Sequence, residues 1–161
     1  AALKIAADKG LSISIKKELH QHCLSIAEDR IVSLQHIIKE TQQAANNETK
    51  SSAGDKHETG RAMAQLETEK LTTQLSEALK IKQSLTQINP ELVAKNGSLG
   101  SIIYTNKGNF YIAASVGKVE IANELFFAIS PASPIGKLLL TKKEKESFSF
   151  NGNEYIITNI I

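Results

Sequence analysis

The chain has 161 residues, which suits one medium domain or two small ones. Hydrophobic residues make up 41% and charged residues 22%, as in an ordinary globular protein, and the formal net charge is +2. A charge this small gives no support for a nucleic-acid-binding or membrane-binding surface. Because no apolar run approaches the ~20 residues that cross a bilayer, we expect no membrane partner.

The ends and the cysteine count bound the location. Residues 1–11 lack the basic start and long apolar core of a signal peptide. We expect them to lie outside the fold, as a loosely held leader or as residues left over from protein production. Cys23 is the single cysteine, so no intrachain disulfide can form. This favours a reducing compartment, and a cytoplasmic location is expected.

Residues 12–90 are expected to form a helical hairpin. No Gly or Pro interrupts the stretch from Ile15 to Asn47, which is rich in good helix formers. Small and polar residues from Thr49 to Asp55 predict a loop, and a second helix is expected from near His57 to about Gln87, ended by Asn89-Pro90. Apolar or small residues recur at heptad spacing in both helices: Leu24, Ala27, Ile31, Leu34, Ile38, Thr41 and Ala45, then Ala64, Leu71, Ala78 and Leu85.

Two helices of about 30 residues each would span roughly 45–50 Å. A short connection between matched heptad seams predicts that they pair antiparallel, with the hairpin end near residues 49–58. Ile26, Ile37 and Cys23 would widen the apolar stripe.

Residues 91–161 are expected to form a separate β domain. All three Tyr and five Phe lie at or after Tyr104, so this half can build its own core and should fold as a fragment from Glu91 to Ile161. Ser133 is a plausible N-cap, with Pro134 at the first position of a short helix. The whole is α+β, with a mostly antiparallel sheet. Strands are expected at Leu99–Thr105, Phe110–Val116, Val119–Ile121, Leu125–Ile129, around Phe148 and Phe150, and at Tyr155–Ile161.

Two stretches of the sequence contain short motifs. Gly54-Asp55-Lys56-His57-Glu58 lies between the two predicted helices, and the stretch from Ile129 to Leu139 precedes and enters the short predicted helix. The first resembles the Gly-Asp-x-x-Glu signature of the bacterial Gre transcript-cleavage factors, and the second resembles that family's Ser-Pro-Ile/Leu segment before a short helix. The order of the two parts agrees as well, and the resemblance covers nearly all of residues 15–161.

This resemblance implies an accessory factor, without an enzyme activity of its own. It implies an FKBP-like C-terminal domain that docks at the entrance of the secondary channel of bacterial RNA polymerase. The hairpin would pass through that channel, and its acidic end would help to hold a polymerase Mg²⁺ while the polymerase cleaves the 3′ end of backtracked RNA. The site residues implied are Asp55 and Glu58 for the shared metal, and Ser130, Pro131, Ser133, Pro134 and Ile135 for the partner.

The hairpin end also departs from the family pattern. Family members usually follow the Glu with Asn, a further acid and an aromatic, whereas Glu58 is followed by Thr59, Gly60, Arg61 and Ala62. The departure favours an alternative, a regulator that occupies the same channel without stimulating cleavage. A third reading is a coiled-coil interaction protein unrelated to polymerase.

The acidic pair itself has two chemical interpretations. Mg²⁺ prefers oxygen ligands and often takes only one or two carboxylates. Two metal ions stabilise the attacking and leaving oxygens in phosphodiester hydrolysis, so Asp55 and Glu58 suit a shared metal and no intrinsic cofactor. The same spacing is that of a capping box, with Asp55 at the N-cap and Glu58 three residues later.

Two further clusters favour ordinary structural roles. His20, His22 and Cys23 could suggest zinc, but His20 and His22 point apart on a helix and zinc sites normally need three or four ligands. Cys23 is therefore expected to be a small core residue. Lys142, Lys143 and Lys145 alternate with Glu144 and Glu146, which is typical of a solvated turn; docking to an acidic polymerase surface is the alternative.

Overall fold

The computed structural model describes the backbone of residues 2–51 and 55–161, and the side chains of residues 10, 12–47 and 58–161. Two compact units divide the chain, Ala27–Lys82 and a second one made of Ala1–Ile26 with Gln83–Ile161. The elements follow in the order α1 (Ala2–Ser51), α2 (Asp55–Thr86), β1 (Ile102–Thr105), β2 (Gly108–Ile112), β3 (Gly117–Ile121), β4 (Glu124–Ile129), α3 (Pro134–Leu139), β5 (Ser147–Phe150) and β6 (Asn153–Ile160).

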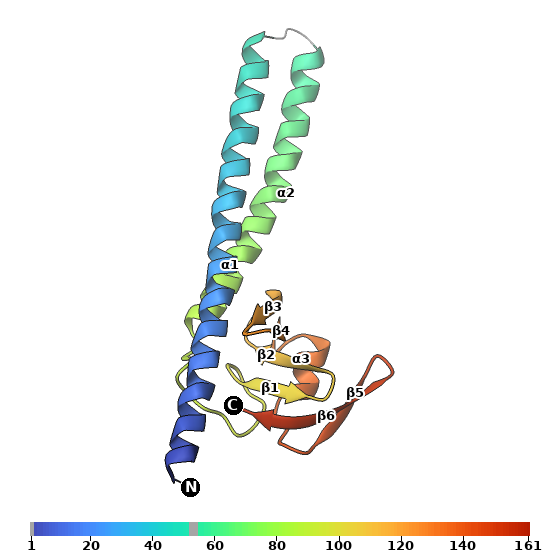
Figure 1. The fold of residues 1–161 in the computed structure, drawn as a ribbon. Coiled ribbons are helices and arrows are strands. Elements are labelled where there is room, and N and C mark those ends of the chain that lie inside the picture. The colour runs from blue at the N-terminus through green and yellow to red at the C-terminus, as the bar shows by residue number, and fades with distance from the viewer. Residues whose placement is uncertain (1, 52–54) are drawn as a thin grey trace. The chain divides into compact units, whose positions relative to one another are not determined.

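The unit Ala27–Lys82 is an antiparallel pair of helices, formed by the C-terminal half of α1 and most of α2 (Figure 1). Its core is the predicted heptad seam: buried Ile31, Leu34, Leu71 and Ala78 pack together, with Ile38 and Leu75 against them. Ile26 and Ile37 lie outside this seam, each 42% exposed. Burying each large aliphatic side chain contributes about 1.5–3 kcal/mol, so this short cluster is the main support of the pair.

The helix bounds differ from those expected. α1 has 50 residues and α2 has 32, so the expected length of about 30 residues is confirmed for α2 and wrong for α1. α1 begins at Ala2, so it extends into residues 1–11, and their expected role as a leader or as leftover residues stays a prediction. This stretch holds good helix formers, and extending an existing helix needs no new nucleus, so the isolated Gly10 does not stop it. The predicted loop starts too early as well, since α1 continues to Ser51.

The second unit contains a six-stranded sheet in the order β3-β4-β2-β1-β6-β5. Four of its pairings are antiparallel, but β2 and β4 pair in parallel, from Asn109 opposite Phe126 to Ile112 opposite Ile129. The sheet is therefore mixed, although antiparallel pairs dominate as predicted. Its core cluster consists of Ile103, Phe110, Ile112, Leu139, Phe148, Ile157 and Ile160.

The N-terminal half of α1, up to Ile26, belongs to this second unit. Nδ1 of His20 lies 2.7 Å from the hydroxyl oxygen of Tyr111 on β2. Nζ of Lys16 donates to the carbonyl of Leu92 at 2.6 Å, in the segment that follows α2. Leu19 and Cys23, on the same side of α1, are fully buried. The β part is thus built together with a helix that is remote in sequence, and the whole fold is α+β.

Candidate functional site

The acidic motif stands where α2 begins. α2 starts at Asp55 and α1 ends at Ser51, so the motif marks the connection between the two helices. Positions 55 and 58 are one turn apart in α2, which suits either a shared metal or a helix cap. The side chain of Asp55 lies outside the described residues, and the side chain of Glu58 is exposed. Both interpretations of the pair therefore stay predictions.

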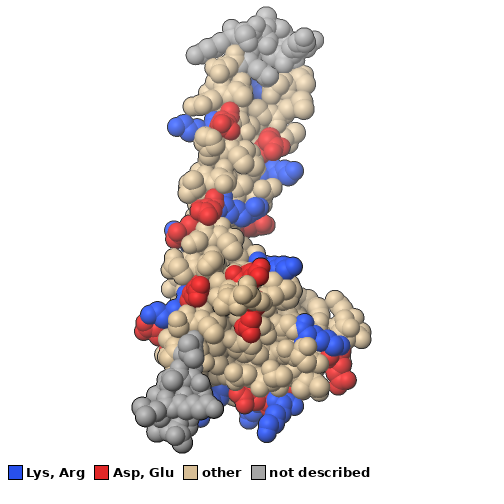
Figure 2. All heavy atoms as spheres, in the orientation of Figure 1, with Lys and Arg blue, Asp and Glu red and all other residues tan. Residues whose placement is uncertain are grey.

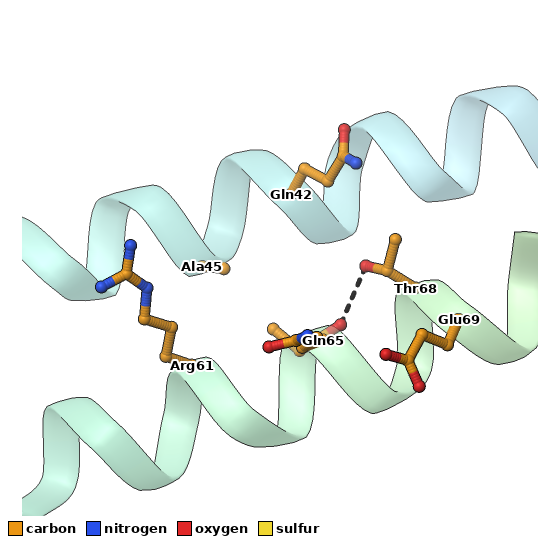
Figure 3. Close-up of a pocket in the computed structure, with 7 residues that line it drawn as sticks. Gln42, Ala45, Arg61, Gln65, Thr68 and Glu69 are labelled. Carbon is orange, nitrogen blue, oxygen red and sulfur yellow. Dashed lines mark hydrogen bonds between the residues drawn. The ribbon is translucent and has the colours of Figure 1, made fainter.

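A polar groove of about 340 Å³ lies between the helices one turn further along α2. Arg61 extends from α2 toward α1 near Ala45 (Figure 3), and Gln42 and Gln65 also line the groove. The hydroxyl of Thr68 donates to the carbonyl of Ala64 at 2.8 Å within α2. Arg61 thus stands where the Gre sequence pattern has an acid, and its cationic side chain lines the groove between α1 and α2.

Charge at the start of α2 is balanced. Asp55 and Glu58 are matched in formal charge by Lys56 and Arg61. Among the described atoms on the face shown in Figure 2, acidic and basic side chains alternate along the helices without forming a large patch of one sign. Such a site attracts Mg²⁺ only weakly by itself, because its basic residues offset the negative charge of its acids. A metal would have to be held mainly by another molecule.

The segment before α3 is a tightly bonded turn. The Ser133 hydroxyl donates to the Ser130 carbonyl at 2.6 Å and accepts from the Gly136 amide at 3.1 Å, so Ser133 is the predicted N-cap. The amide of Ala132 donates to the Ser130 hydroxyl at 3.1 Å. A Cβ at Gly136 would lie 2.1 Å from the Ser130 carbonyl oxygen, so only glycine fits there.

The hydrogen bonds within this turn limit which of its groups are available to a partner. The hydroxyls of Ser130 and Ser133 are engaged within the turn, and Ile135 packs against the core cluster of the sheet. Pro134 and Ala132 are the exposed residues of the turn. Its Ser-Pro-Ile-Gly sequence thus has a sufficient structural explanation, and a partner-binding role for Ser130, Pro131, Ser133, Pro134 and Ile135 stays a prediction.

The lysine-rich segment forms a turn, as predicted. Nζ of Lys142 lies 3.8 Å from a carboxylate oxygen of Glu146, and both side chains are partly solvated. Exposed ion pairs of this type contribute about 0–1 kcal/mol. The segment therefore gives no independent sign of a binding surface.

Cys23 is buried, which confirms its expected place in the core. Burial raises the pKa of its thiol to about 12, so the thiol is protonated at neutral pH. His20 faces Tyr111 and His22 is exposed, so the three residues do not converge on one point. Among the described residues, no group of three or more His, Cys, Asp or Glu side chains is placed to hold a metal ion.

Comparison with solved structures gives a distant likeness. No protein-family model and no curated protein matches the chain. A solved structure described as that of the transcription factor Gfh1 is similar over 85% of this chain and 92% of that chain, with 17% identity and a TM-score of 0.35. A likeness of this size does not transfer a function. In the part of the chain that the structure describes, no helix has the length and apolar character to cross a membrane.

Sequence reasoning missed the contacts between α1 and the β part. Lys16 and His20 are polar, so the heptad pattern of apolar residues did not include them. Their side chains are nevertheless only 2% and 6% exposed. A signal was present: Lys16, Leu19, His20 and Cys23 follow the spacing of one helix face. Burial lowers the pKa of Lys16 to about 8 and lowers the pKa of His20. Burial, with a smaller effect of Cys23, raises the pKa of Tyr111.

Proposed function

We propose that this protein is a transcription factor of the Gre type that binds bacterial RNA polymerase. The observation that carries the proposal is the position of the Gly-Asp-x-x-Glu motif, between the end of α1 at Ser51 and the first turn of α2. A capped Ser-Pro-Ile-Gly turn before α3 supports it, because both motifs occur in the same chain and in the order of the family.

In this proposal, the helical pair enters the secondary channel of the polymerase and presents Asp55 and Glu58 to the active centre. Their carboxylates share a Mg²⁺ ion with the polymerase, which hydrolyses its own backtracked RNA. Two carboxylates are enough when the other ligands come from a second molecule and from water. The protein supplies ligands and position, and the nuclease chemistry belongs to the polymerase.

The decisive experiment removes the acids. Asp55→Ala with Glu58→Ala should abolish stimulated cleavage of RNA in stalled polymerase complexes while binding stays within a few fold. The matched control is Glu67→Ala with Glu77→Ala, which removes two exposed acids from the same helix and should leave cleavage intact. A wild-type protein that does not bind polymerase would overturn the proposal in favour of an unrelated coiled-coil protein.

Arg61 favours a second candidate, a regulator of the same channel that does not stimulate cleavage. The cation lies one turn after Glu58 and along the groove between the helices, where it opposes the binding of a metal. If this reading holds, wild-type protein binds polymerase without raising cleavage at saturating Mg²⁺. Arg61→Asp with Ala62→Tyr, which restores the family pattern, should then introduce measurable cleavage.

A further inference from the structure

A second cavity lies within the unit that contains the sheet. Its volume is about 360 Å³, in the range typical of small-molecule sites. Lys16 of α1 lines it, together with residues of the segment between α2 and β1, among them Ile88, Leu92, Val93 and Leu99. Neither the hairpin end nor the turn before α3 contributes to it.

Apolar side chains make up much of the wall of this cavity, and the polar side chains of Gln87, Asn89 and Ser98 complete it. Leu92 is 65% exposed, Leu99 is 52% exposed and Val93 is 47% exposed. Single exposed aliphatic residues are common, but three around one cavity form a surface from which water is readily displaced. An apolar group placed there would cover them at a gain of about 25 cal/mol for each Å² removed from water.

A buried cation lies in the same cavity. Lys16 is only 2% exposed, and its Nζ donates to the Leu92 carbonyl at 2.6 Å. An ammonium group has three N–H donors. Among the described residues, no carboxylate lies within 4.0 Å of Nζ of Lys16. The carboxylate of Glu91 pairs with the neighbouring Lys17, whose Nζ lies 3.1 Å away. Buried charges are normally paired because their desolvation is costly, so this cavity lacks an anion.

We propose that the cavity binds a small organic monocarboxylate with an apolar tail. The carboxylate accepts hydrogen bonds from the remaining N–H groups of Lys16, and the tail covers Leu92, Val93 and Leu99. A phosphate fits less well, because Lys16 is the only charged residue, of those the structure describes, that lines the cavity, and one ammonium cannot balance about two negative charges. This inference does not depend on the proposed role at RNA polymerase.

Octanoate is the probe, titrated into the full chain by isothermal titration calorimetry at pH 7, well below its micelle-forming concentration. We expect saturable binding at one site, at least tenfold tighter than that of 1-octanol, which has the same tail without the charge. Octylamine, with a like charge facing Lys16, should not bind. Equal affinities for octanoate and octanol, non-saturable uptake, or no binding of octanoate would each overturn the proposal.

Two variants locate the site. Lys16→Met should weaken octanoate binding at least tenfold, whereas the matched control Lys17→Met, at the exposed neighbour, should stay within twofold of wild type. If Lys16→Met does not fold by far-UV circular dichroism, Leu99→Asp replaces it, because Leu99 is already half exposed. Leu99→Asp should repel octanoate and change octanol binding much less. Unchanged octanoate affinity in these variants would place the bound molecule elsewhere and contradict the proposal.

Discussion

The pair His20 and Tyr111 shows how one polar contact joins distant parts of the chain. Nδ1 of His20 lies 2.7 Å from the Tyr111 hydroxyl, and the rings are nearly perpendicular at 86°. Tyr111 is fully buried, so its hydroxyl needs a partner. Burial lowers the pKa of His20 and raises the pKa of Tyr111, and both side chains are therefore neutral at pH 7.

Tyr111→Phe should lower the free energy of unfolding by about 1–2 kcal/mol, because His20 would stay buried without its partner. Urea denaturation at pH 7 followed by circular dichroism measures it. The control is Tyr155→Phe, which keeps the ring stacked on Phe148 at 4.9 Å and should change stability by less than about 0.5 kcal/mol. Equal stability of Tyr111→Phe and wild type would mean that this contact contributes nothing net.

Lys16 gives a pH signature. Its pKa is about 8 in the folded protein, against 10.5 for an ordinary lysine, so between these values the unfolded state holds more protons. Stability attributable to Lys16 therefore rises with pH through this window, by at most about 1.4 kcal/mol per pH unit. The difference in unfolding free energy between wild type and Lys16→Met, measured from pH 7 to 10, should move in favour of wild type. Taking the difference removes the opposing effects of Cys23 and Tyr111, and a flat difference would contradict the burial of the ammonium.

At the scale of elements, the sequence predicted the features that depend on residues close together in the chain. The heptad seam placed Ile31, Leu34, Leu71 and Ala78 in the core of the helical pair, and the Ser133 cap and Pro134 located the start of α3. Both signals are local. The parallel pairing of β2 with β4 was not predicted, because pairing partners depend on side-chain packing across the sheet rather than on the strands' own sequences. For the candidate site, the sequence predicted that the acidic motif lies at the connection between the helices. It did not predict that the Arg61 side chain lines the groove between them.

The length of the helical pair can be tested separately from the chemistry of its end. Deleting Ala27 to Ser33 and Leu71 to Glu77 removes one heptad from each helix, keeps the seam in phase and shortens the pair by about 10 Å. Leu34 and Ala78 remain of the buried cluster. We expect a helical protein that binds polymerase but no longer affects its active centre, since misplacement by even ~1 Å can reduce a positioned reaction a hundredfold.

Helicity by far-UV circular dichroism and competition with wild type for polymerase are the controls for this deletion. Full activity of the shortened protein would show that the helical pair does not act by reach. The functional surface would then lie in the β part, and Asp55 and Glu58 would be a helix cap.

At the scale of the whole molecule, the expected boundary near residue 90 differs from the division of the structure into two compact units. The unit with the sheet includes Ala1–Ile26 as well as Gln83–Ile161. His20 and Tyr111 are 91 positions apart, and Lys16 and Leu92 are 76 apart. Periodic patterns in a sequence do not reveal contacts between residues so far apart. The composition shift at Tyr104 therefore suggested a β domain that folds without α1.

A fragment from Glu91 to Ile161 should therefore be markedly less stable than the full chain, in contrast to the sequence-based expectation. Adding a synthetic peptide of residues 12–28 should restore near-UV circular dichroism, because it returns Leu19, His20 and Cys23 to the β part. A peptide with Leu19→Asp is the control and should not restore it. A fragment that melts cooperatively without the peptide, at the temperature of the full chain, would show that the helix is dispensable.

The strand order has a consequence for synthesis of the chain. β1 lies in the interior of the sheet between β2 and β6, and Ile102 and Ile161 exchange two backbone hydrogen bonds, of 2.9 and 3.0 Å. At roughly 5–20 residues per second, the chain that completes this pairing follows β1 by several seconds. During that time β1 presents an unpaired edge, which is a template for association with other chains. A ribosome-bound chaperone that covers β1 and β2 would have its greatest effect in this interval.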